Sequence, residues 1–298
     1  MNSSRATMGT IRTATGLAFV VGASRSAFMV LAMNSGTDVL NRLFVQPIAL
    51  IASVAAASLA FQVAADLPAG SSMRRAWWLM TASAAAAVGR YVMELLAVWW
   101  NWKVVSDPIV SLRQVPGVLA LVLLLGSLVL MWVTFARMGL GLSLRKRDLL
   151  AVFALLILLP PIMSFRESMA DAGSIYVVLR YLQFSQPFLL VITGAFAVVL
   201  LRIAEETGDG QLARSLRYLA YFLILRLLLM TAAIVPEIQQ IVPLKVIRGG
   251  FNVAAPCLFT LAISCRWQLT ASARAALGRL SPAPAQADRT RAGAIRVW

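Results

Sequence analysis

The fold of this chain is constrained most strongly by seven apolar runs, each long enough to cross a lipid bilayer. A membrane-spanning helix needs about 20 mostly apolar residues. The runs cover residues 43–64, 76–100, 116–136, 149–165, 176–201, 217–236 and 249–266. Hydrophobic residues make up 60% of the chain and its mean hydropathy is +0.81, well above the values of soluble domains. The sequence therefore predicts an all-α protein, a polytopic transmembrane helix bundle.

An eighth span is plausible near the N-terminus. Residues 14–33 are apolar enough to insert into a bilayer but carry Arg25 near their centre. The same segment has the features of a signal peptide, with small residues after a short apolar core. We expect eight helices between residues 14 and 266 if the segment spans, and seven if it does not.

Basic residues in the loops predict the orientation of the bundle. Most of them fall on one side, which the positive-inside rule makes cytoplasmic. They are Arg74, Arg75, Arg137, Arg145, Lys146, Arg147, Arg202, Arg214, Arg217 and the arginines from Arg266 onward. The C-terminus is then cytoplasmic, and residues 1–13 are cytoplasmic too if residues 14–33 span. Residues 267–298 form a basic, flexible tail, at most briefly helical over residues 270–280. Because nearly all basic residues are arginine and alanine is abundant, we expect a bacterial inner-membrane protein.

An ungapped shift of 140 residues aligns the chain with itself. It places Phe44, Gln46 and Pro47 on Phe184, Gln186 and Pro187, and also matches Gly70 to Gly210, Arg74 to Arg214 and Pro116 to Pro256. Polar residues and prolines in register are harder to obtain by chance than alanine or leucine. The shift predicts a parallel internal repeat, with halves at about 5–136 and 145–266, an arrangement known in transporters.

The composition excludes several classes of site. The chain has no histidine, which removes His-dependent acid–base chemistry, imidazole metal sites and His-ligated haem. Its two cysteines, Cys257 and Cys265, lie in one apolar run and indicate neither a disulfide framework nor a thiol metal site. We expect no cofactor, no metal and no nucleic-acid partner, and no enzyme activity, with a lipid-modifying membrane enzyme as the remaining enzymatic option.

Arg90, Glu94 and Arg226 are ionisable residues near the centres of predicted spans. A charge at that depth costs roughly 2.5–3.5 kcal/mol and usually faces the bundle interior or a cavity. Arg90 and Glu94 are four residues apart, so they can form an internal ion pair on one helix face. Arg226 has no such partner, and the alternative for it is to extend toward the membrane surface or to bond to Ser, Thr and carbonyl groups between helices. A guanidinium can grip a carboxylate or phosphate through two hydrogen bonds, so these residues predict a site for an anionic solute or lipid headgroup.

Two Gln-Pro dipeptides, Gln46-Pro47 and Gln186-Pro187, stand at matched positions of the repeat. Proline inside a helix frees a backbone carbonyl, and the neighbouring amide both donates and accepts hydrogen bonds. Gln46 and Gln186 are therefore further candidates for ligand binding, although kinks are common in ordinary membrane helices.

These features favour a small transporter or permease, with a charged site at the interface between the repeats. The alternative is a non-catalytic sensor or scaffold subunit, in which buried ion pairs fix helix register. Membrane lipids are expected partners in both cases, with an anionic solute in the first and a membrane protein or a second copy of the chain in the second.

Overall fold

Six α-helices form the part of the chain that the computed structural model describes, residues 37–99, 114–140, 177–234 and 242–280. The helices are α2 (Thr37–Asp66), α3 (Ser72–Trp99), α5 (Gln114–Arg137), α8 (Val177–Glu206), α9 (Gln211–Ile234) and α11 (Val242–Leu280). There is no β-strand in these ranges, so the all-α prediction is confirmed for them. The predicted spans at residues 14–33 and 149–165 lie outside the described residues.

Two of the described helices contain a stretch long and apolar enough to cross a membrane. These stretches are Pro47–Asp66 in α2 and Val115–Arg137 in α5. Both coincide with spans predicted from the sequence. The count of eight helices and the internal repeat remain predictions.

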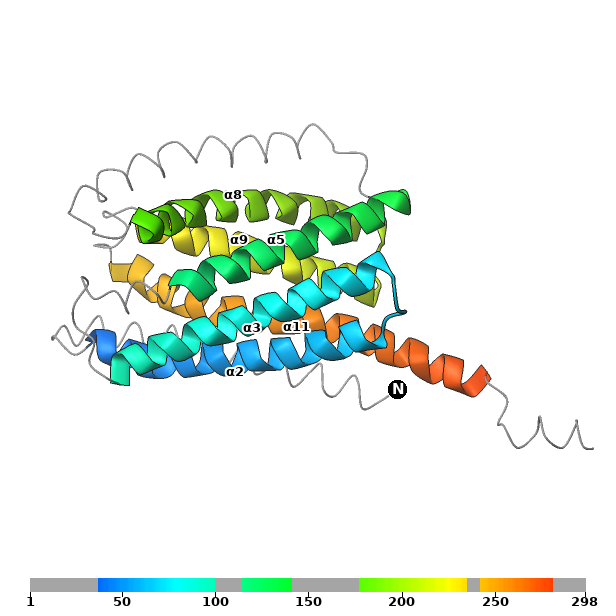
Figure 1. Ribbon diagram of the computed structural model, residues 1–298, viewed down its shortest axis with the longest axis horizontal. Helices are drawn as coiled ribbons and strands as arrows, with labels where there is room; N and C mark the ends of the chain where they lie inside the picture. Colours follow the sequence, from blue (N-terminus) through cyan, green and yellow to red (C-terminus); the bar gives the residue numbers. More distant parts are fainter. Residues whose placement is uncertain (1–36, 100–113, 141–176, 235–241, 281–298) are drawn as a thin grey trace, which may run out of the picture.

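The six helices pack side by side in a closed ring. Each contacts its neighbours in the order α2, α3, α5, α8, α9, α11 and back to α2. In Figure 1, α2, α5, α8 and α11 run in one direction, and α3 and α9 run in the other. The two short turns, between α2 and α3 and between α8 and α9, consequently lie at the same end of the bundle (Figure 1).

Small residues allow the helices to approach closely. Ala56, Ala60 and Ala64, spaced at intervals of four, form a buried face of α2. Between α3 and α5, a Cβ added at Gly126 would come within 3.3 Å of the Leu79 side chain. Without water to drive association, membrane helices depend on such close packing and on hydrogen bonds between helices.

Hydroxyl groups connect neighbouring helices of the ring. Each donates to a backbone carbonyl of the next helix, at 2.7–2.8 Å, which satisfies a buried polar group that would otherwise be costly. The bonds are Ser83 to Ala120 and Ser127 to Ala76 between α3 and α5, Ser215 to Ala262 between α9 and α11, and Thr260 to Ala52 between α11 and α2.

The turn between α2 and α3 is fixed by local chemistry. Gly70 has a φ of 83°, a conformation that residues with a Cβ rarely adopt. The Ser71 hydroxyl accepts a hydrogen bond from the Arg74 amide at 3.1 Å, capping the start of α3. The corresponding turn between α8 and α9 has Gly208 at a φ of 76°.

Helix α11 extends well past the predicted span. It continues without a break to Leu280, so residues 267–269 are helical as well as the stretch 270–280 in which a brief helix was expected. The reason lies in the residues themselves, since the stretch after Arg266 contains alanine, leucine, arginine and glutamine, which have high helix propensity. Residues 281–298 lie outside the description.

Candidate functional site

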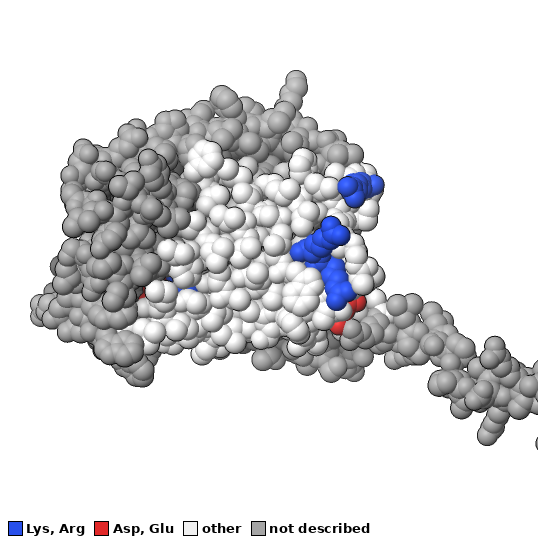
Figure 2. Space-filling view, viewed as in Figure 1, with Lys and Arg blue, Asp and Glu red and all other residues white. Residues whose placement is uncertain are grey.

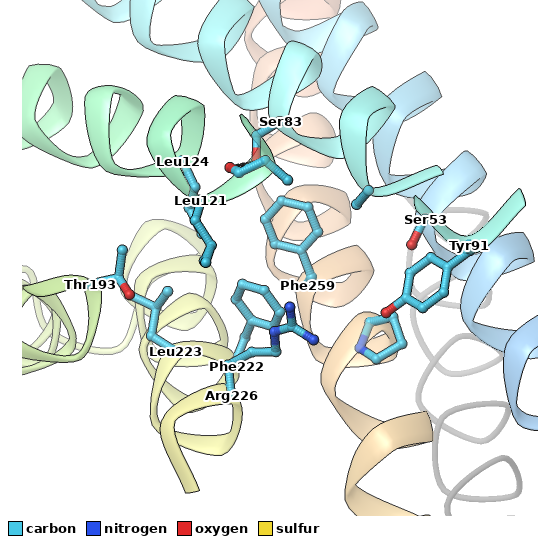
Figure 3. A pocket seen from close by; sticks show the side chains of 13 residues that line it. Ser53, Ser83, Tyr91, Leu121, Leu124, Thr193, Phe222, Leu223, Arg226 and Phe259 are labelled. Atoms are coloured by element: carbon cyan, nitrogen blue, oxygen red, sulfur yellow. Dashed lines mark hydrogen bonds between the residues drawn. The ribbon is translucent and has the colours of Figure 1, made fainter. Parts of the chain in front are cut away.

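A cavity of about 60 Å³ lies inside the ring, and all six helices contribute to its wall. The volume is sufficient for a few water molecules. Its polar lining comes from Ser53 of α2, Ser83 and Tyr91 of α3, Thr193 of α8 and Arg226 of α9. Because every helix contributes, the cavity lies at the centre of the ring (Figure 3).

Among the described residues that line the cavity, Arg226 is the only one with a formal charge. It is the sixteenth residue of α9, about 22 Å along the helix from Gln211, and so far from both helix ends. Within the described part of the chain it forms no salt bridge. A guanidinium there has the geometry and the charge to bind an oxyanion.

Tyr91 faces Arg226 across the cavity. Figure 3 shows the phenol of Tyr91 and the guanidinium of Arg226 pointing toward one another, from α3 and α9. Tyr91, Arg90 and Glu94 are close enough to Arg226 to interact with it electrostatically. The structure therefore brings Arg226 near the other two charged residues predicted for the site.

Arg90 and Glu94 form the ion pair that their spacing predicts. Arg90 Nε lies 2.9 Å from Glu94 Oε1, with side-chain exposures of 32% and 17%. Neither residue lines the cavity, whereas their neighbour Tyr91 does. Glu94 shares the helix face of Tyr91 but lies about one turn further along α3. Successive helical residues differ by about 100° in direction, so Arg90 and Tyr91 cannot both face the centre.

The remaining predicted site residues, Gln46 and Gln186, belong to α2 and α8. Their side chains lie outside the described residues. Pro47, which follows Gln46, is inside α2, as predicted.

The hydroxyl-bearing side chains were missed by sequence reasoning. Ser53, Ser83 and Thr193 line the cavity, and Ser83 is already engaged with the Ala120 carbonyl. One signal was present: Ser53 and Thr193 are separated by 140 residues, the same shift that aligns the two halves. A search of that alignment for paired hydroxyl groups would have found them.

Two further observations complete the description of the site. No group of three or more His, Cys, Asp or Glu side chains within the described ranges is placed to hold a metal ion. No protein-family model matches the chain, and no curated protein or solved structure is significantly similar to it.

Proposed function

We propose that this chain is a multi-spanning transporter of the bacterial inner membrane, which carries a small anionic solute through its central cavity. The observation that carries the proposal is a cavity walled by all six described helices, with the cation Arg226, which forms no salt bridge with another described residue, in its lining. An uncompensated charge deep in a bundle is costly, and a bound anion would relieve that cost.

The surface of the bundle supports placement in a membrane. Large apolar side chains face outward along the helices, including Ile51, Phe61, Leu119 and Leu228, which are 49–69% exposed. The described surface in Figure 2 is largely uncharged between its two ends. Such a continuous apolar surface is unfavourable in water and suits a lipid environment.

The distribution of charge supports an orientation. Arginines gather at the end that holds the two short turns (Figure 2). They are Arg74, Arg75, Arg137, Arg202, Arg214, Arg217 and Arg266. The positive-inside rule makes this end cytoplasmic, together with the C-terminus of α11.

The arrangement of helices supports an internal repeat. α2 and α8 are each 30 residues long, and Val177 follows Thr37 by 140 residues. Within each half, consecutive helices pack together, and the halves meet through α5 with α8 and through α11 with α2. Repeats of parallel orientation with a site at their interface are typical of secondary transporters. The predicted spans at residues 14–33 and 149–165 would complete two four-helix units.

One observation favours a scaffold or sensor instead. The Arg90–Glu94 pair is complete on a single helix and does not line the cavity, as expected of charges that only fix helix packing. In that case the cavity would stay closed to water on both sides of the membrane.

Water access to the cavity distinguishes the two functions. Cys257 and Cys265 are first replaced by serine, and a single cysteine is then introduced at Ser53 or Thr193, which are buried but line the cavity. We expect a membrane-impermeant thiol reagent to label both positions, from one or both faces of oriented membrane vesicles, because alternating access exposes the site to water.

Ser127→Cys is the matched control, since Ser127 is fully buried between α3 and α5 and does not line the cavity. It should remain unlabelled. Resistance of both cavity cysteines from both faces would refute the transport proposal and leave the scaffold reading.

A further inference from the structure

A second, smaller cavity lies at the arginine-rich end of the bundle, apart from the central one. Helices α3, α5, α9 and α11 form its wall, and its volume is about 20 Å³, room for one oxygen-sized group. Met73 and Leu212, each the second residue of its helix, are in the lining, so the cavity is close to the helix ends.

Two buried donors in this lining have no acceptor. Trp77 Nε1 and Arg266 Nε are shielded from solvent and form no hydrogen bond in the described structure. Trp77 as a whole is only 5% exposed, whereas Arg266 is partly exposed. Buried donors are almost always satisfied in proteins, so two of them around one cavity indicate an acceptor that the described residues do not supply.

No side chain of the lining accepts a hydrogen bond from either donor. Its hydroxyl group, Ser215, donates to the Ala262 carbonyl at 2.7 Å and accepts from neither Trp77 nor Arg266, and its sulfur atoms belong to methionines, which are weak acceptors. None of the carboxylates in the described ranges forms a salt bridge with Arg266. The missing group should therefore carry negative charge as well as an acceptor oxygen.

We propose that this cavity binds an oxygen of a phosphate group, with Arg266 Nε and Trp77 Nε1 as donors. The most direct source is the headgroup of an anionic phospholipid in the cytoplasmic leaflet, since basic pockets between helices on that side bind such lipids. The Nε atom of Arg266 is buried, but the side chain as a whole is partly exposed at the protein surface. The neighbouring arginines attract anions to this end of the bundle. The assignment of the phosphate to a lipid headgroup rests on the membrane placement proposed above, but not on the transport function.

The test uses the full-length protein purified in a neutral detergent. Native mass spectrometry measures retention of phosphatidylglycerol, phosphatidylcholine and inorganic phosphate by the unmodified protein and by Arg266→Gln and Trp77→Phe. Matched controls are Arg75→Gln and Trp78→Phe, whose residues are exposed neighbours at the same end of the bundle. Trp77→Phe preserves most of the packing, so it keeps the test valid if Arg266→Gln fails to fold.

We expect phosphatidylglycerol to be retained more strongly than phosphatidylcholine. Arg266→Gln should weaken that retention about tenfold, because a charge-assisted bond is lost, and Trp77→Phe about threefold. Both controls should match the unmodified protein. Retention of inorganic phosphate with the same dependence on Arg266 and Trp77 would support the site and identify free phosphate as its source.

Equal retention of phosphatidylglycerol by all five proteins, or equal retention of the two lipids, would overturn the proposal and indicate a bound water molecule instead. An Arg226→Gln protein separates this inference from the transport proposal. It should bind the lipid normally, since Arg226 lines the other cavity.

Discussion

Helices α3 and α9 each carry an arginine deep in the bundle, but their surroundings differ. On α3, Glu94 lies one turn beyond Arg90 and pairs with it at 2.9 Å. On α9, the residue four positions beyond Arg226 is Met230, which offers no charge. Arg90 does not line the central cavity, whereas Arg226, which has no salt bridge to another described residue, does.

Under the transport proposal, this difference separates a structural charge from a functional one. An ion pair on one helix compensates its own charge and needs nothing from outside the chain. The charge of Arg226 has no such compensation in the described structure, so a ligand can provide it. Tyr91 contributes a phenol to the same cavity from the α3 side. In the proposed transporter the two helices therefore have different roles: α3 carries a complete ion pair, and α9 carries the arginine that binds the solute.

The largest expected effect is the loss of anion transport in Arg226→Gln. Loss of a charge-assisted hydrogen bond in a low-dielectric site should weaken anion binding about 10- to 100-fold while leaving the protein inserted and folded. Uptake of phosphate, sulfate and acetate into proteoliposomes measures the effect for each anion. The matched control is the double variant Arg90→Leu with Glu94→Leu. It removes the ion pair of α3 and should retain uptake.

Normal uptake by Arg226→Gln, or a similar loss in the double variant, would contradict the division of roles between the two helices.

The stability of the protein should depend on the Arg90–Glu94 pair, which is not expected to affect uptake. Glu94→Leu alone leaves Arg90 without its partner, and we expect it to lower the free energy of unfolding by about 1–3 kcal/mol, between the values for exposed and fully buried pairs. Replacing both residues by leucine should restore most of that stability, because an ion pair can often be exchanged for apolar packing. Thermal unfolding in detergent compares the two variants. A double variant less stable than Glu94→Leu would show that the pair has a structural role beyond its own charge balance.

Much of the architecture follows from the sequence. The bounds of α5, Gln114–Arg137, lie within two residues of the predicted run, because apolar residues fill nearly its whole length. α2, α9 and α11 extend beyond their predicted runs at one end or both, since polar residues can continue a helix once the apolar part has formed. Hydropathy marks the membrane-spanning part and not the helix ends.

The site was only partly predictable. Arg226 and the Arg90–Glu94 pairing could be found because charges in apolar runs are rare and the spacing of four is specific. The sequence could not predict that Arg90 and Glu94 do not line the cavity, because this depends on how α3 is rotated against its neighbours. Ser53 and Thr193 were hidden for a different reason. Hydroxyl residues commonly satisfy interhelical hydrogen bonds in membrane bundles, so their type alone does not indicate a binding site.

The smallest expected effect comes from giving α9 the arrangement of α3. Met230→Glu places a carboxylate four residues beyond Arg226, the same spacing and order as Arg90 and Glu94. The new acid should pair with Arg226 and compete with the solute, which weakens anion uptake about fivefold, the equivalent of roughly 1 kcal/mol. Met230→Gln is the matched control, since it has the same length without the charge, and it should keep normal uptake. Raising the anion concentration should restore uptake by the Met230→Glu protein, because an internal competitor raises KM and leaves the maximal rate unchanged. A fall in maximal rate with unchanged KM would mean that the acid disturbs the bundle and does not compete for Arg226, and the contrast between the two helices would then lose its support.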